Sequence, residues 1–209
     1  MAIVSEIREI RGLIDISLDG MSWIKVRKKH FSLLPVESGE VIDAEQYLDR
    51  LAALQTADCY EAALTILDQA AQTSGDMRIK LLRKGYVQPA ADAVVERLTG
   101  NGLIDDNRYA QRIAQGQVSK PVGAYAVRRK LRAKRLPEEA IDAAMEEFDG
   151  EQQTQACRSA AEKLWRKYES LPAREGKAKL SQALARRGFS WDSIHSALVE
   201  ICCVDDWDV

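Results

Sequence analysis

The chain has 209 residues, of which 46% are hydrophobic and 30% are charged, and its formal net charge at pH 7 is −2. These values are typical of an ordered globular protein with enough apolar residues for a sizeable core. The small negative charge argues against a protein that coats nucleic acid over its whole surface. No stretch approaches the roughly 18 apolar residues of a membrane-spanning helix, and the charged N-terminus lacks the apolar stretch of a signal peptide. We therefore expect a cytoplasmic protein without a membrane segment.

Residues 3–34 have the pattern of β-strands. Apolar and β-branched residues dominate residues 13–18, and residues 23–27 alternate in the manner of a half-buried strand. Asp19–Gly20, which separates these two stretches, is a strong signal for a tight hairpin. Residues 31–34 are a candidate third strand. We expect a small antiparallel sheet at the start of the chain.

A helix over about residues 44–55 is expected next. Asp43 is a candidate N-cap, and Gln46 completes the capping-box pattern three residues later. We take residues 1–56 as an N-terminal segment made of the hairpin and this helix. Because this segment shares no pattern with the rest of the chain, we expect that deletion of residues 1–42 leaves a folded helical array.

From residue 57 onward the pattern is helical and repeats itself. Leu81, Leu131 and Leu184 occupy the same place in three similar stretches, at offsets of 50 and 53 residues. Such a period marks repeated supersecondary units, each with a repeated core. The expected units are three-helix repeats at residues 57–102, 103–150 and 151–204, followed by an acidic tail at residues 205–209.

Each repeat is expected to contain three helices with a turn between the second and third. In the first repeat, helices are expected over about residues 58–72, 76–84 and 88–100. Gly85 and Gly188 follow the second helices of repeats one and three, so each is expected at positive φ. Arg135 stands at the same place in repeat two, where a left-handed arginine would cost about 1–2 kcal/mol. Either that turn differs, or Arg135 serves an interface.

The predicted fold class is therefore mainly α: a tandem array of three three-helix repeats preceded by a small N-terminal antiparallel β segment. A short helical array presents an extended surface rather than a closed pocket. This organisation indicates a macromolecular partner.

The strongest candidate for such a contact is a basic helix in the second repeat. Val127 and Leu131 define its buried side, and acidic residues from Glu138 to Glu147 follow it. A basic helix beside an acidic one suits a protein partner better than bare phosphate. The alternative is an ordinary solvated face. The candidate contact residues are Arg128, Arg129, Lys130, Arg132, Lys134 and Arg135, with Arg83, Lys84, Arg186 and Arg187 at related places in the other repeats.

The sequence offers no candidate catalytic residue, metal ligand or cofactor site. Cys59, Cys157, Cys202 and Cys203 have no metal-ligand spacing and are expected to be reduced thiols. The chain contains no Gly-rich phosphate loop, nucleophile elbow or zinc-protease motif. The remaining residues of interest have simpler interpretations: His30 and His195 as surface or packing residues, Asp105–Asp106 as a helix cap, and Trp165 and Trp191 as core or inter-repeat packing rather than base-stacking platforms.

Several short motifs are more specific together than singly. Residues 102–110 read Gly-Leu-Ile-Asp-Asp-Asn-Arg-Tyr-Ala, and the second helices of repeats one and three end in Arg-Lys-Gly-Tyr and Arg-Arg-Gly-Phe. Over about residues 59–201 the chain resembles the RecX family, regulatory proteins of the RecA recombinase. The N-terminal strands resemble the extra β segment that some members carry. Arg135 departs from the family pattern, which usually has glycine there.

The resemblance implies a protein that is not an enzyme and needs no cofactor. RecX-like proteins bind along the groove of the RecA–DNA filament and inhibit ATP hydrolysis and strand exchange, and so modulate recombination and the SOS response. For this chain the resemblance implies a monomer whose partner is the RecA filament on single-stranded DNA, with weak direct DNA contact as a further expectation. Two alternatives stay open: a helix-turn-helix DNA-binding regulator and a general scaffolding array.

Overall fold

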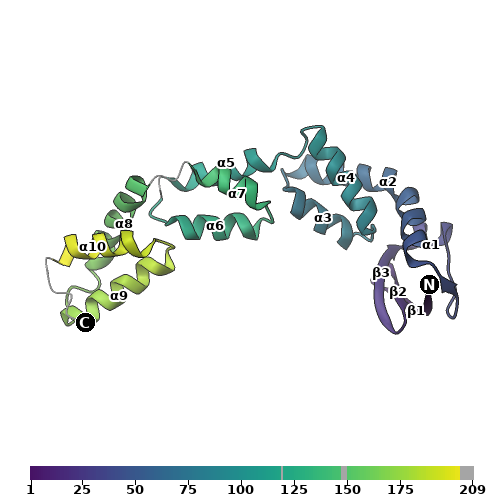
Figure 1. Cartoon of the computed structure of the whole chain (residues 1–209), viewed down its shortest axis with the longest axis horizontal. Coiled ribbons are helices and arrows are strands. Elements are labelled where there is room, and N and C mark those ends of the chain that lie inside the picture. The colour runs from purple at the N-terminus through teal and green to yellow at the C-terminus, as the bar shows by residue number, and fades with distance from the viewer. Residues whose placement is uncertain (119, 147–149, 203–209) are drawn as a thin grey trace. The chain divides into compact units, whose positions relative to one another are not determined.

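The computed structural model describes residues 1–118, 120–146 and 150–202. The chain forms two compact units, Met1–Asp105 and Asp106–Val209. The first contains an antiparallel sheet and the first three-helix repeat, and the second contains the other two repeats (Figure 1). The predicted fold class is therefore confirmed. The acidic tail expected at residues 205–209 lies outside the described residues.

The N-terminal sheet has four antiparallel strands in the order β3-β2-β1-β4. The predicted hairpin turn at Asp19–Gly20 is present, with both residues at positive φ (49° and 85°). A second tight turn at Arg11–Gly12, also at positive φ, joins the first two strands and was not expected from the sequence. The strands are β1 (Ala2–Ile10), β2 (Leu13–Leu18), β3 (Met21–Arg27) and β4 (Val41–Ile42).

The prediction of a strand at residues 31–34 is wrong. Lys28–Leu33 forms a short helix, α1. His30 and Phe31 of this helix and Leu34, which directly follows it, are buried or half-buried, a spacing that brings residues to one side of a helix and not of a strand. The apolar run was too short for its periodicity to distinguish the two.

Helix α2 (Ala44–Gln69) replaces the two helices predicted over residues 44–55 and 58–72. Asp43 caps it as predicted, because its carboxylate accepts hydrogen bonds from the amides of Glu45 and Gln46, both at 3.1 Å. The buried positions recur every three or four residues along the helix, and neither glycine nor proline interrupts it. The boundary drawn between residues 56 and 57 therefore falls inside one continuous helix.

The sheet and the first repeat share a core. Val4, Ile16 and Val26 of the strands belong to the same buried cluster as Leu51 of α2 and Val87, which directly precedes a later helix. Removal of the strands would expose this apolar surface to water. The packing therefore argues against the expectation that residues 1–42 can be deleted without cost to the first repeat.

Hydrogen bonds and ion pairs also join the N-terminal segment to the first repeat. Asp58 on α2 accepts hydrogen bonds from Arg27 (2.8 Å), Lys29 (2.6 Å) and the hydroxyl of Tyr86 (2.9 Å). Burial alone would raise the pKa of Asp58, but these hydrogen bonds and the nearby cations outweigh it and lower the pKa. His30 Nε2 lies 3.3 Å from the same carboxylate, and burial lowers the pKa of this histidine. His30 is thus a buried member of a partly exposed polar cluster, which the sequence did not indicate.

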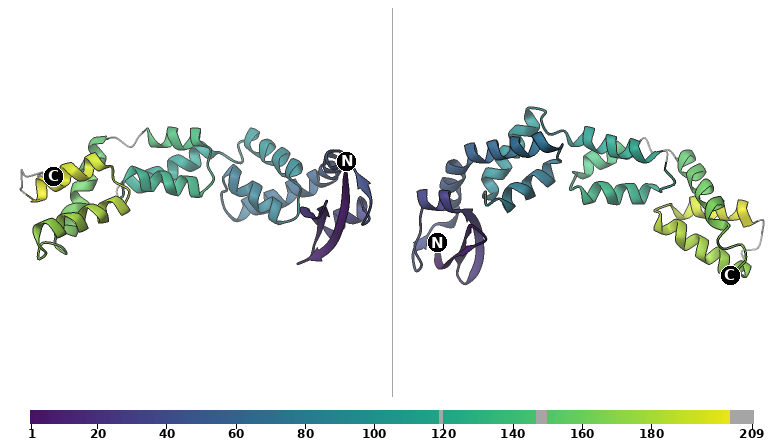
Figure 2. Two further views of the ribbon diagram at one scale, coloured as in Figure 1. Left: turned by 60° about the horizontal axis from the view of Figure 1, so that its bottom comes forward. Right: turned by 180° about the vertical axis from the view of Figure 1, so that it is seen from behind.

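Nine helices longer than α1 build the repeats over the described residues. α2 is completed by α3 (Ser74–Arg83) and α4 (Gln88–Gly100). The three helices of each repeat enclose a core of their own (Figure 2), and Leu81, Leu131 and Leu184 are fully buried at the repeated position. The second unit contains α5 (Asp106–Val118), α6 (Ala124–Ala133), α7 (Glu138–Met145), α8 (Gly150–Trp165), α9 (Ala173–Arg186) and α10 (Trp191–Cys202).

The structure also shows where several individually predicted residues lie. Cys59 and Cys157 are buried free thiols, whereas Cys203 lies outside the described residues. Trp165 packs against the core of the third repeat, as expected. Trp191 does not, because 61% of its surface is exposed. Asp106 begins α5, and the capping role of Asp105–Asp106 stays a prediction.

The turn after the second helix has one conformation in all three repeats. Gly85 and Gly188 have φ of 84° and 83°, as predicted, and Arg135 has φ of 53°. The preceding residues, Lys84, Lys134 and Arg187, have nearly equal φ and ψ angles, close to −80° and 0°. Arg135 therefore adopts the left-handed conformation despite its side chain, and the turn of repeat two does not differ.

Within the second unit, repeat three caps the N-terminus of α6. The amide of Gly123 donates to the carbonyl of Arg187 (2.9 Å), and the amide of Tyr125 donates to that of Gly188 (3.1 Å). The amide of Ala124 donates to Gln153 Oε1 at 2.9 Å. No side chain of its own caps this helix. We call this contact the repeat joint.

The repeat joint depends on glycine. A Cβ added at Gly123 would overlap with the backbone of Gly188, and a Cβ added at Gly188 would overlap with the backbone of Ala126. Gly188→Val should therefore destabilise the protein by more than about 1 kcal/mol, through left-handed strain and this clash together. Urea unfolding followed by circular dichroism measures the loss.

Gly102→Val is the matched control for the clash. Gly102 also follows a helix at positive φ (70°), but an added Cβ would meet no atom within 4 Å. It should cost only the conformational strain. If the two variants lose equal stability, close packing at the repeat joint contributes nothing.

Candidate partner-binding surface

Helix α6 presents its cations to solvent because its apolar residues fix its orientation. Val127 and Leu131 are buried in the core of repeat two. Arg129, Lys130 and Arg132 are exposed and Arg128 is half-buried. Arg129 and Arg132 thus point outward as predicted, whereas Arg128, which was expected outside as well, is half-buried. Exposure alone does not make this side a contact surface, because the charges around it also determine which partner it can bind.

Two of the arginines on α6 are paired with carboxylates of α7. Arg132 makes a bidentate pair with Glu138, at 2.8 and 3.0 Å, and Arg128 donates to Asp142. The hydrogen bond from Arg132 lowers the pKa of Glu138. All four side chains lie near the surface, so each pair contributes little to stability. Their effect is to hold two arginines in place against α7.

Arg129 and Lys130 differ from these two arginines. Both are exposed, and neither makes an ion pair within the part of the chain that the structure describes. They are therefore the cations of α6 most available to an acidic partner. Lys134 and Arg135 follow at the end of the helix, half-buried and exposed respectively.

The basic residues in the other two turns have a local explanation as well. Arg83 and Lys84 end α3 in the first unit, and Arg186 and Arg187 end α9 in the second. Cations at a helix C-terminus are stabilised by the helix dipole, usually by about 0.3–1 kcal/mol. The structure brings Arg187 to the N-terminus of α6 through the repeat joint, whereas Arg83 and Lys84 belong to the other compact unit.

Two exposed aromatic side chains were missed as candidate contact residues. Tyr125 is 65% exposed and Trp191 is 61% exposed, and they are the only exposed aromatics among the described residues. Tyr125 lies four residues before Arg129, and therefore on the same side of α6. That spacing was a usable signal in the sequence. No comparable signal existed for Trp191.

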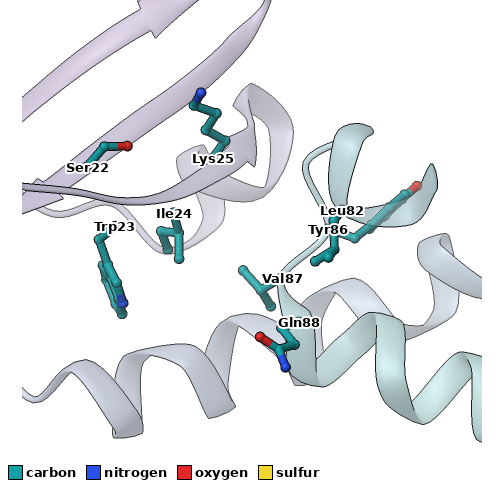
Figure 3. Close-up of a pocket in the computed structure, with 8 residues that line it drawn as sticks. All are labelled: Ser22, Trp23, Ile24, Lys25, Leu82, Tyr86, Val87 and Gln88. Atoms are coloured by element: carbon teal, nitrogen blue, oxygen red, sulfur yellow. The ribbon is translucent and has the colours of Figure 1, made fainter. Parts of the chain in front are cut away.

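A hollow lies in the first unit, beside β3. It has a volume of about 300 Å³ and is lined by Trp23, Ile24, Val87 and Gln88 among others. In Figure 3, Trp23 and Ile24 extend from the strand on the side where Val87 and Gln88 lie, at the start of α4. The lining brings together no set of acid, base and nucleophile, so it has no evident chemistry.

The described residues form neither a metal site nor a membrane span. No group of three or more histidine, cysteine, aspartate or glutamate side chains among them could hold a metal ion. None of the helices described is both long and apolar enough to span a bilayer.

Comparison with protein families gives three matches in tandem. The models of the first, second and third three-helix domains of RecX match residues 59–98, 105–145 and 151–198, respectively. The matched segments correspond to the three repeats of the structure, in the same order. The family resemblance read from the repeat motifs is therefore supported in every repeat.

Curated proteins and solved structures agree with these matches. The regulatory protein RecX of Limosilactobacillus reuteri is 30% identical over 193 residues, which cover 91% of this chain and 73% of that protein. That of Chlorobaculum tepidum is 34% identical over 137 residues, or 65% of this chain and 83% of that protein. A crystal structure of a regulatory protein RecX has a TM-score of 0.63 at 27% identity and covers 94% of this chain and 98% of its own. The RecX structure from Lactobacillus salivarius, at 23% identity, shares the fold with a TM-score of 0.64 and covers 73% of this chain and 99% of its own.

Proposed function

Because this chain belongs to the RecX family, we propose that it is a non-enzymatic regulator that binds the RecA filament on single-stranded DNA. On this proposal it inhibits ATP hydrolysis and strand exchange by RecA. The observation that carries the proposal is the match of all three three-helix domains in tandem. RecA as the partner follows from the family resemblance read from the sequence.

The charges around α6 support a protein partner over bare DNA. The exposed cations of α6 lie beside Glu138 and Asp142, with which two of them pair. These carboxylates would repel the phosphates of a nucleic acid. A protein partner can match this mixed surface, with carboxylates facing Arg129 and Lys130 and cations facing Glu138 and Asp142, whereas a phosphate backbone offers negative charge alone.

The rival function is that of a helix-turn-helix DNA-binding regulator. In such a protein the helix after the turn enters the major groove. The corresponding helix in repeat two is α7, which begins with exposed Glu138 and Glu139. Negative charges at this place disfavour insertion into DNA, so we regard this rival as the weaker proposal.

The proposal predicts a dose-dependent fall in RecA ATP hydrolysis. Purified protein is titrated into RecA with circular single-stranded DNA and ATP, and hydrolysis is followed by a coupled assay. Binding to duplex DNA without RecA is measured in parallel. Undiminished hydrolysis at saturating protein would contradict the proposal, and tight binding to duplex DNA alone would favour the rival.

A further inference from the structure

Gln55 of α2 is a fully buried amide whose orientation is fixed by the turn of repeat one. Its Oε1 accepts a hydrogen bond from the amide of Val87 at 2.7 Å, and its Nε2 donates to the carbonyl of Gly85 at 3.2 Å. A backbone amide can only donate and a carbonyl can only accept. Exchanging the two ends of the Gln55 side chain would therefore break both bonds, so Nε2 is a donor where it stands.

The same nitrogen determines where His30 carries its proton. Gln55 Nε2 lies 3.3 Å from His30 Nδ1, and because the amide nitrogen donates, Nδ1 must accept. A neutral imidazole has one ring nitrogen that accepts and one that carries the proton. The proton of His30 is therefore on Nε2, which lies 3.3 Å from the carboxylate oxygen Oδ2 of Asp58. His30 has one state that suits all its neighbours, the neutral imidazole with its proton on Nε2.

A second proton on His30 has no place in this arrangement. It would set an Nδ1–H donor against the donor nitrogen of Gln55. Turning the amide of Gln55 round would remove this conflict, but it would place the nitrogen against the amide of Val87 and the oxygen against the carbonyl of Gly85. All of these groups are buried, and a buried donor or acceptor without a partner is costly. Protonation of His30 therefore breaks the contact between Gln55 and the turn.

Charges from three elements and one turn side chain bear on His30. Asp58 of α2 would favour a positive imidazole, but its carboxylate already accepts hydrogen bonds from Arg27 of β3, Lys29 of α1 and Tyr86. The ring of Tyr86 lies 5.9 Å from that of His30. Burial is the main reason why the pKa of His30 lies below its usual value of 6.5; Asp58 opposes this shift, whereas Lys29 and Arg27 add to it.

We propose that His30 is a pH-sensitive latch, which holds the turn of repeat one against α1 and α2 while the imidazole is neutral and releases the turn when the imidazole takes up a second proton. The latch consists of His30, Gln55 and the backbone of Gly85 and Val87. Arg83 and Lys84 directly precede Gly85 at the end of α3, so release would also loosen the segment that carries these two candidate contact residues. The inference does not depend on the identity of the partner.

The direction of the pH dependence follows from the proton balance. When the latch opens, His30 regains its usual pKa of about 6.5, so the open state binds a proton more readily than the closed state. The latch is therefore fully stable well above pH 6.5 and weakens as the pH falls below that value. The lowered pKa of Asp58 acts in a separate range, because its contribution is lost only as the pH falls below the usual value of 3.8.

The test is hydrogen exchange at the Val87 amide, whose bond to Gln55 is part of the latch. Its opening constant is measured between about pH 7.5 and 5.5 and corrected for the intrinsic pH dependence of exchange. In the wild type, opening should increase at least about threefold over this range, toward the limit of about tenfold that one proton allows. His30→Asn, which offers Gln55 an amide oxygen as acceptor and takes up no proton in this range, should show no such increase.

Two controls confine the effect to His30. His195 is the other histidine of the chain, so His195→Gln removes the remaining imidazole and should leave the response of Val87 as in the wild type. The amide of Ile141 in the second unit donates to the carbonyl of Pro137. Its opening should be the same in the wild type and in His30→Asn at every pH.

Nitrogen NMR of the two histidines tests the latch in the unaltered protein. At about pH 7.5 the proton of His30 should be on Nε2, and His30 should titrate below pH 6.5 in the folded state. A proton on Nδ1, or a pKa of His30 at or above its usual value, would overturn the inference. A Val87 amide that responds to pH equally in the wild type and in His30→Asn would overturn it as well. If His30→Asn does not fold, the two measurements on the wild type still decide.

Discussion

Replacing Arg129 and Lys130 together by glutamate should abolish inhibition of RecA ATP hydrolysis at protein concentrations that saturate the wild type. Both side chains are exposed, and neither pairs with a described residue, so reversal of their charge breaks no ion pair among the described residues. Against an acidic partner it replaces attraction by repulsion, and like charges facing each other at an interface cost several kcal/mol. Affinity should therefore fall at least about a hundredfold.

The choice of these two residues follows from the structure. Reversal at Arg128 or Arg132 would place a glutamate against Asp142 or Glu138, because those are their present partners. The loss of function would then be mixed with damage to the packing of α6 on α7. Arg129→Glu with Lys130→Glu avoids this, and helical content should stay unchanged.

The control is a second double reversal in the same unit, Arg166→Glu with Arg174→Glu. Both residues are exposed and lie in the third repeat, at the end of α8 and the start of α9. Net charge changes equally, so a nonspecific effect of charge would weaken both variants. Full inhibition by the α6 variant would remove this helix from the contact.

The repeated architecture could be predicted from the sequence because the same physical requirement recurs three times. Leu81, Leu131 and Leu184 each fill the core of one three-helix unit, and a left-handed residue must end each second helix. The glycines at 85 and 188 gave the turn directly. Arg135 adopts the same turn because the surrounding helices over-determine it, which outweighs its local cost.

The predictions that were wrong concern segments whose structure depends on contacts with distant parts of the chain. A break was expected between two helices near residues 56 and 57, although no glycine or proline lies there, whereas the continuous stripe from Tyr47 to Ile66 supports one helix. Residues 31–34 carry too few positions to distinguish period two from period 3.6. The shared core of sheet and first repeat joins Val4 to Val87, a pairing of distant segments that no local pattern contains.

The candidate surface was predicted in part. Burial of Val127 and Leu131 fixes which cations of α6 point outward, and this needs only helical spacing. The pairing of Arg128 with Asp142 depends on how α6 packs on α7, and the capping of α6 by the turn of repeat three depends on how these two repeats pack together. Neither follows from periodicity. The exposure of Tyr125, by contrast, could have been inferred from its four-residue spacing to Arg129.

Affinity for RecA should depend strongly on its assembly. Basic residues end the second helix of every repeat, and the two compact units carry separate candidates: Arg83 and Lys84 in the first, and α6 in the second. If these contact neighbouring RecA subunits, a filament offers two linked half-sites where a monomer offers one. Linking makes the second contact intramolecular and can raise overall affinity by roughly 10²–10⁴.

We therefore expect binding to RecA assembled on single-stranded DNA with a non-hydrolysed nucleotide to be at least about a hundredfold tighter than binding to RecA kept monomeric. Both affinities are measured by fluorescence anisotropy at one salt concentration, because charged contacts weaken as salt rises. Truncation of residues 151–209 is a poor probe of bridging, since repeat three also caps α6. Reversal of Arg83 and Lys84 to glutamate is cleaner, because it leaves the second unit intact.

That double reversal should remove most of the filament advantage while leaving the affinity for monomeric RecA within about twofold, because the α6 contact alone sustains monomer binding and avidity needs both. Thr65→Glu, at an exposed position of α2 in the same unit, controls for added negative charge and should keep the full advantage. Equal affinity of the wild type for the two forms of RecA would contradict bridging and leave a one-site binder. A filament advantage that survives reversal of Arg83 and Lys84 would place the second contact elsewhere on the chain.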